Sequence, residues 1–92
     1  MSRLAPILSR RDELMDVKTA ADYAGRSDKT IRLWCRDYGI GRQSGPGATF
    51  EVNMIGLEMV LHGDFAALEM LRAGDRMAPE VRRYLDHIGL AA

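Results

Sequence analysis

Apolar positions recur with a helical period in a short segment near the start of the chain, residues 17–24. Asp16 precedes this segment, and its carboxylate can accept a free backbone amide of a first helical turn. Gly25 follows it and can adopt the left-handed conformation that ends a helix. The pattern therefore predicts a helix over 17–24, with small alanines on the face that a second helix would approach.

A second amphipathic segment begins two residues later, at about residues 28–37. Ser27 offers a cap at its start, and Gly39 stops it at the other end. Four apolar residues recur at i, i+3, i+4 and i+7, which indicates one buried stripe: Ile31, Trp34, Cys35 and Tyr38. Two short helices joined by a tight turn at 25–27 are typical of a helix-turn-helix.

The sequence changes character after Gly39. Two short segments with β propensity, 40–43 and 48–52, flank the turn-rich residues 44–47. This arrangement predicts a hairpin, which directly behind a helix-turn-helix would be a wing.

The remainder of the chain predicts helices, each with its own start signal. These are 54–62 after Asn53, 65–73 after Asp64, and 79–88 with Pro79 in the first turn. The expected fold is mostly α with a small β-hairpin, a winged helix-turn-helix followed by C-terminal helices. We expect one domain over 1–92, comprising a weakly ordered segment 1–15, a DNA-binding core 16–62 and a helical extension 63–92. The core is expected to close over Trp34, and the apolar stripe of the last helix favours self-association.

Charge is unevenly distributed although the net charge is zero. Residues 17–42 hold six basic and three acidic residues, whereas residues 50–92 hold four basic and seven acidic ones. Such a chain can turn one basic side toward DNA while its total remains neutral. The single cysteine, Cys35, excludes an internal disulfide, and the sequence has no apolar run of the roughly 20 residues that a membrane span requires. We therefore expect a cytoplasmic protein that does not bind membranes.

The polar face of the second helix holds the candidate chemistry. Lys29, Arg32 and Arg36 are spaced three and four residues apart, so they share one helical face opposite the apolar stripe. Lysine and arginine on such a face can reach guanine edges or phosphates in a major groove. The alternative interpretation is an ordinary solvated basic face. The predicted DNA-binding residues, from the helix start to the wing, are Ser27, Lys29, Thr30, Arg32, Leu33, Arg36, Arg42 and Gln43.

Catalytic and metal chemistry find little support in the sequence. Cys35, His62 and His87 lie 27 and 25 residues apart, without the paired spacing of a metal site. The glycine-rich residues 39–47 precede a strand and contain no Lys-Ser or Lys-Thr, so they do not form a nucleotide loop. We expect a protein that is not an enzyme and that has no cofactor and no metal.

Residues 17–52 resemble the excisionase and MerR-like winged-helix family. The resemblance rests on VKTAA at 17–21, SDKTIRLW at 27–34 and Gly39-Ile40 entering the wing. It implies a recognition helix at 28–37 and a wing at 42–49. For an excisionase it further implies an architectural role, in which several copies bind repeated sites on double-stranded DNA, bend it and assist an integrase. The later residues 57–75 resemble small helix-turn-helix proteins of bacterial mobile elements, which implies a location on the bacterial nucleoid.

Three alternatives stay open beside the excisionase. The first is a small transcriptional regulator, and the second is a phage packaging subunit that marks DNA. The third is a protein-interaction module that has kept the fold and lost DNA binding, and the zero net charge favours it. The long dimerisation helix of MerR regulators is missing, and the acidic C-terminal half differs from the basic ends of excisionases.

Overall fold

Two short helices, α1 (Val17–Ala24) and α2 (Asp28–Tyr38), pack against each other in the computed structural model, which describes residues 4–90. Asp16 Oδ1 accepts the Thr19 amide at 2.7 Å, and Ser27 Oγ accepts the Thr30 amide at 3.1 Å. The turn between the helices passes through Gly25 at φ 67°, a conformation that disfavours residues with a Cβ. Both predicted helices are confirmed, the second one residue longer than expected.

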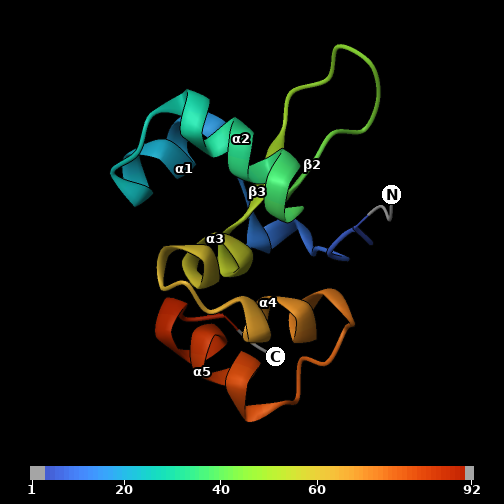
Figure 1. Cartoon of the computed structure of the whole chain (residues 1–92), viewed down its shortest axis with the longest axis vertical. Coiled ribbons are helices and arrows are strands. Elements are labelled where there is room, and N and C mark those ends of the chain that lie inside the picture. The colour runs from blue at the N-terminus through green and yellow to red at the C-terminus, as the bar shows by residue number, and fades with distance from the viewer. Residues whose placement is uncertain (1–3, 91–92) are drawn as a thin grey trace.

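A small antiparallel sheet lies beside this helix pair, with its strands in the order β1-β3-β2. β1 is Leu14–Asp16, β2 is Gly41–Arg42 and β3 is Glu51–Asn53. The predicted hairpin is present as β2 and β3, and the loop 43–50 between them projects from the body of the molecule (Figure 1). The sequence did not indicate β1, which pairs with the central strand through Met15 opposite Val52.

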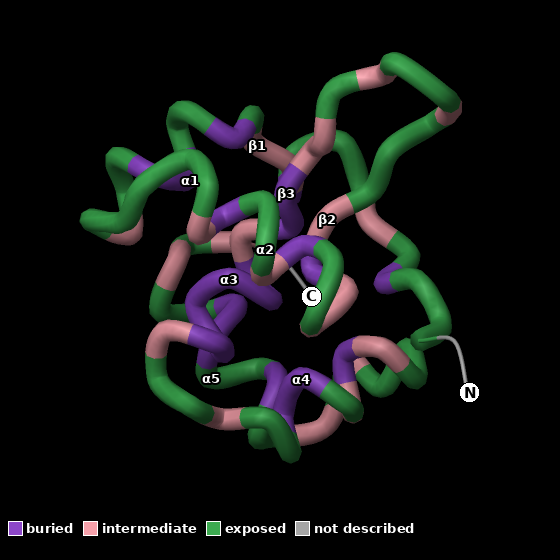
Figure 2. Tube along the Cα trace, turned by 45° about the horizontal axis from the view of Figure 1, so that its top comes forward, coloured by how far each residue is buried: buried purple, intermediate pink, exposed green. Residues whose placement is uncertain are grey.

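Helix α3 (Met54–Leu61) lies at the centre of the molecule. Its residues 55–60 are all buried, and Figure 2 shows this helix buried along its length. Asn53 caps it through a 2.9 Å bond from the Gly56 amide to Oδ1. A helix that is apolar on every side requires neighbours on every side, so the rest of the chain wraps around α3.

Helices α4 (Phe65–Arg72) and α5 (Pro79–Ile88) cover the end of α3 that faces away from the sheet (Figure 1). On α5, Val81, Tyr84 and Leu85 are buried in the core of the chain itself. The stripe for which self-association was expected is therefore mostly used within the domain. Among the described residues, no helix combines the length and apolarity needed to cross a bilayer.

The N-terminal segment is packed against the domain, which differs from the weak order expected for 1–15. Ile7 is 6% exposed and lies in the core, and a 3-10 turn over Arg11–Glu13 (η1) places the Glu13 carboxylate inside. Arg76 donates to Glu13 Oε1 and Oε2 at 2.8 and 2.7 Å. This contact between residues 63 positions apart holds the segment in place. The expectation for residues 1–3 lies outside the described residues.

The core is centred on α3 rather than on Trp34. Trp34 is only partly buried at the edge of the domain, where the Arg26 guanidinium lies 5.8 Å from its ring centroid. Within α2, Ile31 and Cys35 occupy the buried positions instead of Trp34. The largest side chains that are less than 2% exposed include Ile31, Ile40, Ile55, Leu57, Met59, Leu68, Leu71 and Leu85.

Candidate nucleic-acid interface

Helix α2 turns one face inward and the other to solvent. Ile31 and Cys35 are buried, whereas the residues opposite them are exposed, as the sequence predicted: Lys29, Arg32, Leu33 and Arg36. With 11 residues the helix is about 16 Å long, enough to lie across a major groove. Leu33, 44% exposed, adds an apolar group to this basic face.

The cations of this face are free of ion pairs. Across residues 4–90, none of Lys29, Arg32 and Arg36 forms a salt bridge, while Arg72 and Arg76 are both paired. The two mostly buried arginines, Arg72 and Arg76, therefore have ion-pair partners within the fold, whereas the exposed arginines of α2 have none. An exposed cation without an intramolecular partner is free to meet an anion.

The first turn of α2 is held by bonds between the side chain of Ser27 and Thr30. Ser27 and Thr30 bond to each other twice, since Ser27 Oγ accepts the Thr30 amide and donates to Thr30 Oγ1 at 3.0 Å. The Thr30 amide is therefore occupied by the Ser27 cap and is not open to a phosphate. The exposed Asp28 also adds negative charge in the first turn. A phosphate at this end would have to use the amides of residues 28 and 29 or displace the Ser27 cap.

The wing residues Arg42 and Gln43 are both engaged within the hairpin. Arg42 Nε lies 3.1 Å from Glu51 Oε1, its cross-strand partner, and both side chains are about half exposed. Gln43 Nε2 donates to the Ala48 carbonyl and braces the loop. Both residues are exposed. Both side chains stabilise the hairpin loop, and a partner would have to bind them in competition with these internal contacts.

A cleft of about 510 Å³ lies between the start of α1, helix α2 and the loop 43–50. It brings Arg32 together with Gln43, two of the predicted residues. Lys18, exposed in the first turn of α1, lines the same cleft and was not among them. Its signal in the sequence is a basic residue two positions after the Asp16 cap. Asp16 and Asp28 also line the cleft, while Arg36 lines a separate one beside Leu4 and Pro6.

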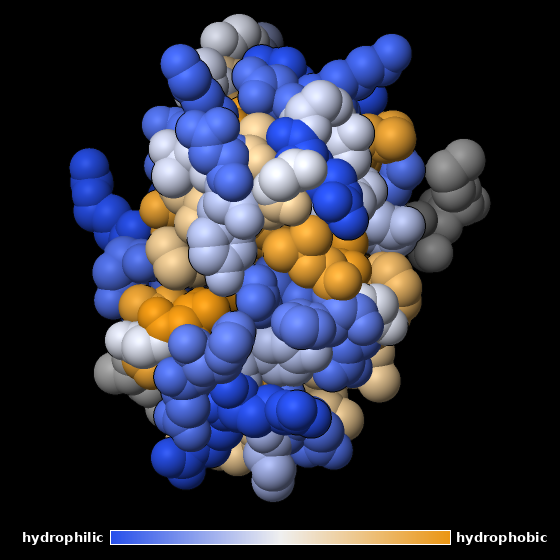
Figure 3. Space-filling view, turned by 90° about the vertical axis from the view of Figure 1, so that its left-hand side faces the viewer, coloured by the Kyte–Doolittle hydropathy of each residue, from blue (hydrophilic) through white to orange (hydrophobic). Residues whose placement is uncertain are grey.

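The α1 side of the molecule is hydrophilic at both ends, with apolar groups between them at mid-height (Figure 3). The lower end is more acidic at the surface than α2, because Arg72 and Arg76 bond inward. Four carboxylates stay exposed there against two arginines, Arg82 and Arg83; the carboxylates are those of Glu69, Asp75, Glu80 and Asp86. The charge asymmetry of the sequence is thus also an asymmetry between the α2 face and the far end of the fold.

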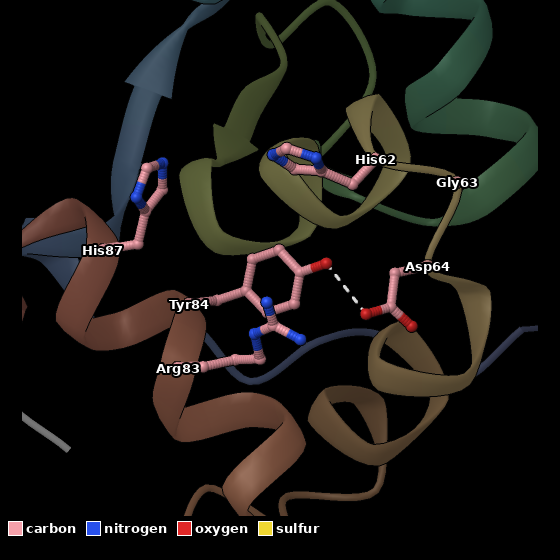
Figure 4. Close-up of a pocket in the computed structure, with 6 residues that line it drawn as sticks. All are labelled: His62, Gly63, Asp64, Arg83, Tyr84 and His87. Atoms are coloured by element: carbon pink, nitrogen blue, oxygen red, sulfur yellow. Dashed lines mark hydrogen bonds between the residues drawn. The ribbon is translucent and has the colours of Figure 1, made fainter.

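A second group of polar side chains gathers at the C-terminal end of α3, around a cleft that the sequence did not indicate (Figure 4). Glu58, His62 and His87 each offer an atom within 4.8 Å of the others. The four-residue spacing of Glu58 and His62 was the available signal, because it places both on one helical face. Cys35 lies elsewhere; burial raises the pKa of its thiol to about 11, so it stays protonated at neutral pH.

Comparison with known proteins adds no relative. No protein-family profile, curated protein or solved structure matches the chain significantly.

Proposed function

We propose that this chain is a sequence-specific binding protein for double-stranded DNA, a winged helix-turn-helix in which α2 is the recognition helix and the loop 43–50 is the wing. The proposal rests on one observation above the others. Lys29, Arg32 and Arg36 are exposed together on α2 and have no ion-pair partner among residues 4–90.

The surroundings of α2 support the same interpretation. The turn 25–27 holds α1 against α2, and Lys18 of α1 faces the cleft that Arg32 lines. The loop 43–50 stands beside this cleft and projects beyond the helices (Figure 1). A groove-binding helix flanked by a backbone contact on each side is the usual geometry of this class.

Within DNA binding, the resemblance of residues 17–52 favours an excisionase, which would bind repeated sites, bend the DNA and assist an integrase. Such a role requires no catalytic group, because bending redirects the reaction of another enzyme. A small transcriptional regulator is the alternative. The two are separated by the sites that are bound, since repeats beside an integrase attachment site and a promoter are different targets.

The first experiment measures the salt dependence of binding to a duplex. If Lys18, Lys29, Arg32 and Arg36 neutralise one phosphate each, log K falls with log salt at a slope of about −3.6, or about 150-fold between 50 and 200 mM. Arg32→Ala should reduce that slope by about 0.9 and weaken binding. Arg82→Ala is the matched control, because Arg82 is equally exposed but lies on α5, at the other end of the fold.

The second experiment retains sheared genomic DNA of the source organism on the protein and sequences what is held. Clustered direct repeats beside an attachment site support the excisionase, and a promoter supports the regulator. The proposal fails if wild-type protein enriches nothing above the Arg32→Ala/Arg36→Ala variant, or if its affinity is insensitive to salt. If Arg32→Ala and Arg82→Ala weaken binding equally, binding does not depend on α2 in particular and the assignment of α2 as the recognition helix is wrong.

A further inference from the structure

Three potential metal ligands converge where the ends of α3 and α5 meet. Glu58 lies in the last turn of α3, His62 is the residue that caps this helix, and His87 lies in the last turn of α5. His62 Nε2 is 3.5 Å and His87 Nε2 is 3.2 Å from the same atom, Glu58 Oε1. None of the three residues lies on α2 or lines the cleft beside it.

The fold holds the three residues together through packing. The i, i+4 spacing places Glu58 and His62 on one face of α3. Val81, Tyr84 and Leu85 are buried in the core, and α5 packs directly against α3, which brings His87 over Glu58. The site is therefore preformed by the hydrophobic core rather than by its own contacts.

The two distances to Glu58 Oε1 are compatible with a shared tetrahedral metal ion. Metal–ligand bonds of about 2.0–2.2 Å at tetrahedral angles separate ligand atoms by about 3.3–3.6 Å. The 3.5 Å distance from His62 lies within this range and exceeds the usual N–H···O limit of about 3.2 Å, while the 3.2 Å distance from His87 lies at the boundary between the two. Two imidazoles that both approach one carboxylate oxygen enclose the position that a cation would occupy.

The other oxygen of Glu58 is held by a group outside the cluster. Tyr23 of α1 donates its hydroxyl to Glu58 Oε2 at 2.9 Å, which orients the carboxylate and leaves Oε1 for the cluster. Burial and this bond to Glu58 raise the pKa of Tyr23, so its hydroxyl remains a donor. A hydrogen-bonded partner behind a ligating carboxylate is a common feature of metal sites.

Groups of both signs lie at this point, since the Arg83 guanidinium lines the same cleft while three other features supply negative charge. The C-terminal ends of α3 and α5 meet here, and each carries the partial negative charge of a helix C-terminus. Glu58, with a side chain only 9% exposed, adds a carboxylate charge. The imidazoles are 60% and 62% exposed, so their nitrogens are accessible to an ion from solvent.

We propose that Glu58 Oε1, His62 Nε2 and His87 Nε2 bind one divalent transition-metal ion, with Zn²⁺ as the preferred ion. Two imidazoles and a carboxylate suit Zn²⁺, whereas Ca²⁺ and Mg²⁺ prefer oxygen ligands throughout. His62 and His87 line the cleft of about 720 Å³ shown in Figure 4, from which water could reach the ion and complete the tetrahedron. The bound ion would join the end of α5 to α3.

Two other groups of the cleft are excluded as ligands by their own contacts. Asp64 accepts the Tyr84 hydroxyl at 2.8 Å and the Ala67 amide at 3.2 Å, so both its oxygens are in use. Burial and the bond to Asp64 raise the pKa of Tyr84 to about 12, which keeps it from ligating as a phenolate. Figure 4 shows the Tyr84 hydroxyl turned toward Asp64.

The test uses the full chain without a histidine tag, stripped of metal and titrated with Zn²⁺ by calorimetry at pH 7.5. We expect one ion per chain with a dissociation constant in the micromolar range or below. At a free Zn²⁺ concentration about a hundredfold above that constant, the melting temperature should rise by about 10 °C or more. Titration with Co²⁺ should give the visible absorption of a tetrahedral complex.

His62→Asn and His87→Asn should each weaken binding by at least about tenfold, with the metal-free melting temperature nearly unchanged because both side chains are mostly exposed. Asp86→Asn is the control, since Asp86 neighbours His87, is exposed and lies outside the cluster. Zn²⁺ affinity that survives either histidine variant, a stoichiometry other than one, or a millimolar dissociation constant would overturn the proposal. DNA binding by the Asn variants should match wild type without metal, so the two proposals can fail separately.

Discussion

The ion pair between Glu13 and Arg76 makes a quantitative prediction about stability. The Glu13 side chain is 1% exposed and that of Arg76 is 16% exposed, and the two form a bidentate contact. Arg76 also donates to the Leu8 carbonyl at 3.0 Å, so one guanidinium holds two points of the N-terminal segment. Glu13→Gln keeps the shape of the side chain but leaves the cation of Arg76 without its counter-charge in a poorly solvated position.

Removal of one partner of a buried pair costs about 3–5 kcal/mol. For a domain of this size each kcal/mol lowers the melting temperature by about 4–8 °C, so Glu13→Gln should lower it by about 12 °C or more. The matched control is Glu69→Gln. Glu69 pairs with Arg72 but is 61% exposed, so its loss should cost less than about 1 kcal/mol.

The same pair predicts how this loss depends on pH. Burial raises the pKa of Glu13, but the bonds from Arg76 and from the Arg10 amide outweigh it and bring the pKa below the usual 4.5. The carboxylate therefore stabilises the fold above about pH 4.5, and this contribution is lost as the pH falls through the lowered pKa. Urea unfolding of wild type and Glu13→Gln should differ most at neutral pH and converge in acid. A loss below 1 kcal/mol at pH 7, or a difference that does not narrow in acid, would refute the reasoning.

Three further predictions concern the α2–sheet junction and the α3 cap. Asn53→Ala should lower the free energy of unfolding by about 1–2 kcal/mol in urea titration, because it removes the cap of α3, while Asn53→Ser should retain most of it. Gly41→Ala should cost about 1–3 kcal/mol in the same assay, because the new Cβ would lie against Cys35 Sγ and 2.9 Å from Cys35 Cβ; a variant as stable as wild type would contradict that packing. The Cys35 thiol, with its pKa raised from 9.0 to about 11, should react with a disulfide reagent at pH 8 at least about a hundredfold more slowly in the folded than in the unfolded chain. Rapid labelling of the folded protein would mean that α2 opens frequently.

Helix boundaries could be predicted because their causes are local. Each N-cap side chain accepts the amide three residues ahead, so a window of four residues is enough to predict the cap. The four caps are Asp16, Ser27, Asn53 and Asp64. The exposed face of α2 was predictable for the same reason, since it is the complement of an apolar stripe on the same helix. The central position of α3 follows from its apolar residues on every face, a pattern visible in the sequence at 54–61.

Features that depend on distant partners were not predictable in this way. β1 has three residues and no alternation of its own, and it exists because β3 lies beside it. The engagement of Arg42 with Glu51 depends on strand register, and the inward role of Arg76 depends on a carboxylate 63 positions earlier. His87 joins Glu58 only because α5 folds back on α3, so the distance between them in sequence gave no indication of the cluster.

Arginines of the C-terminal half make contacts that can form only after most of the chain has been synthesised. Arg72 donates to the carbonyls of Ala5 and Tyr38, at 2.8 and 2.6 Å. One guanidinium of α4 thus joins the N-terminal segment to the last residue of α2. During synthesis, α1 and α2 can form their mutual contacts as soon as they leave the ribosome, because these contacts are short-range. The segment before them must wait until more than 70 residues have been made. The α1–α2 pair therefore rests on short-range contacts, whereas the final helical third fastens the first residues of the chain to the rest of the fold.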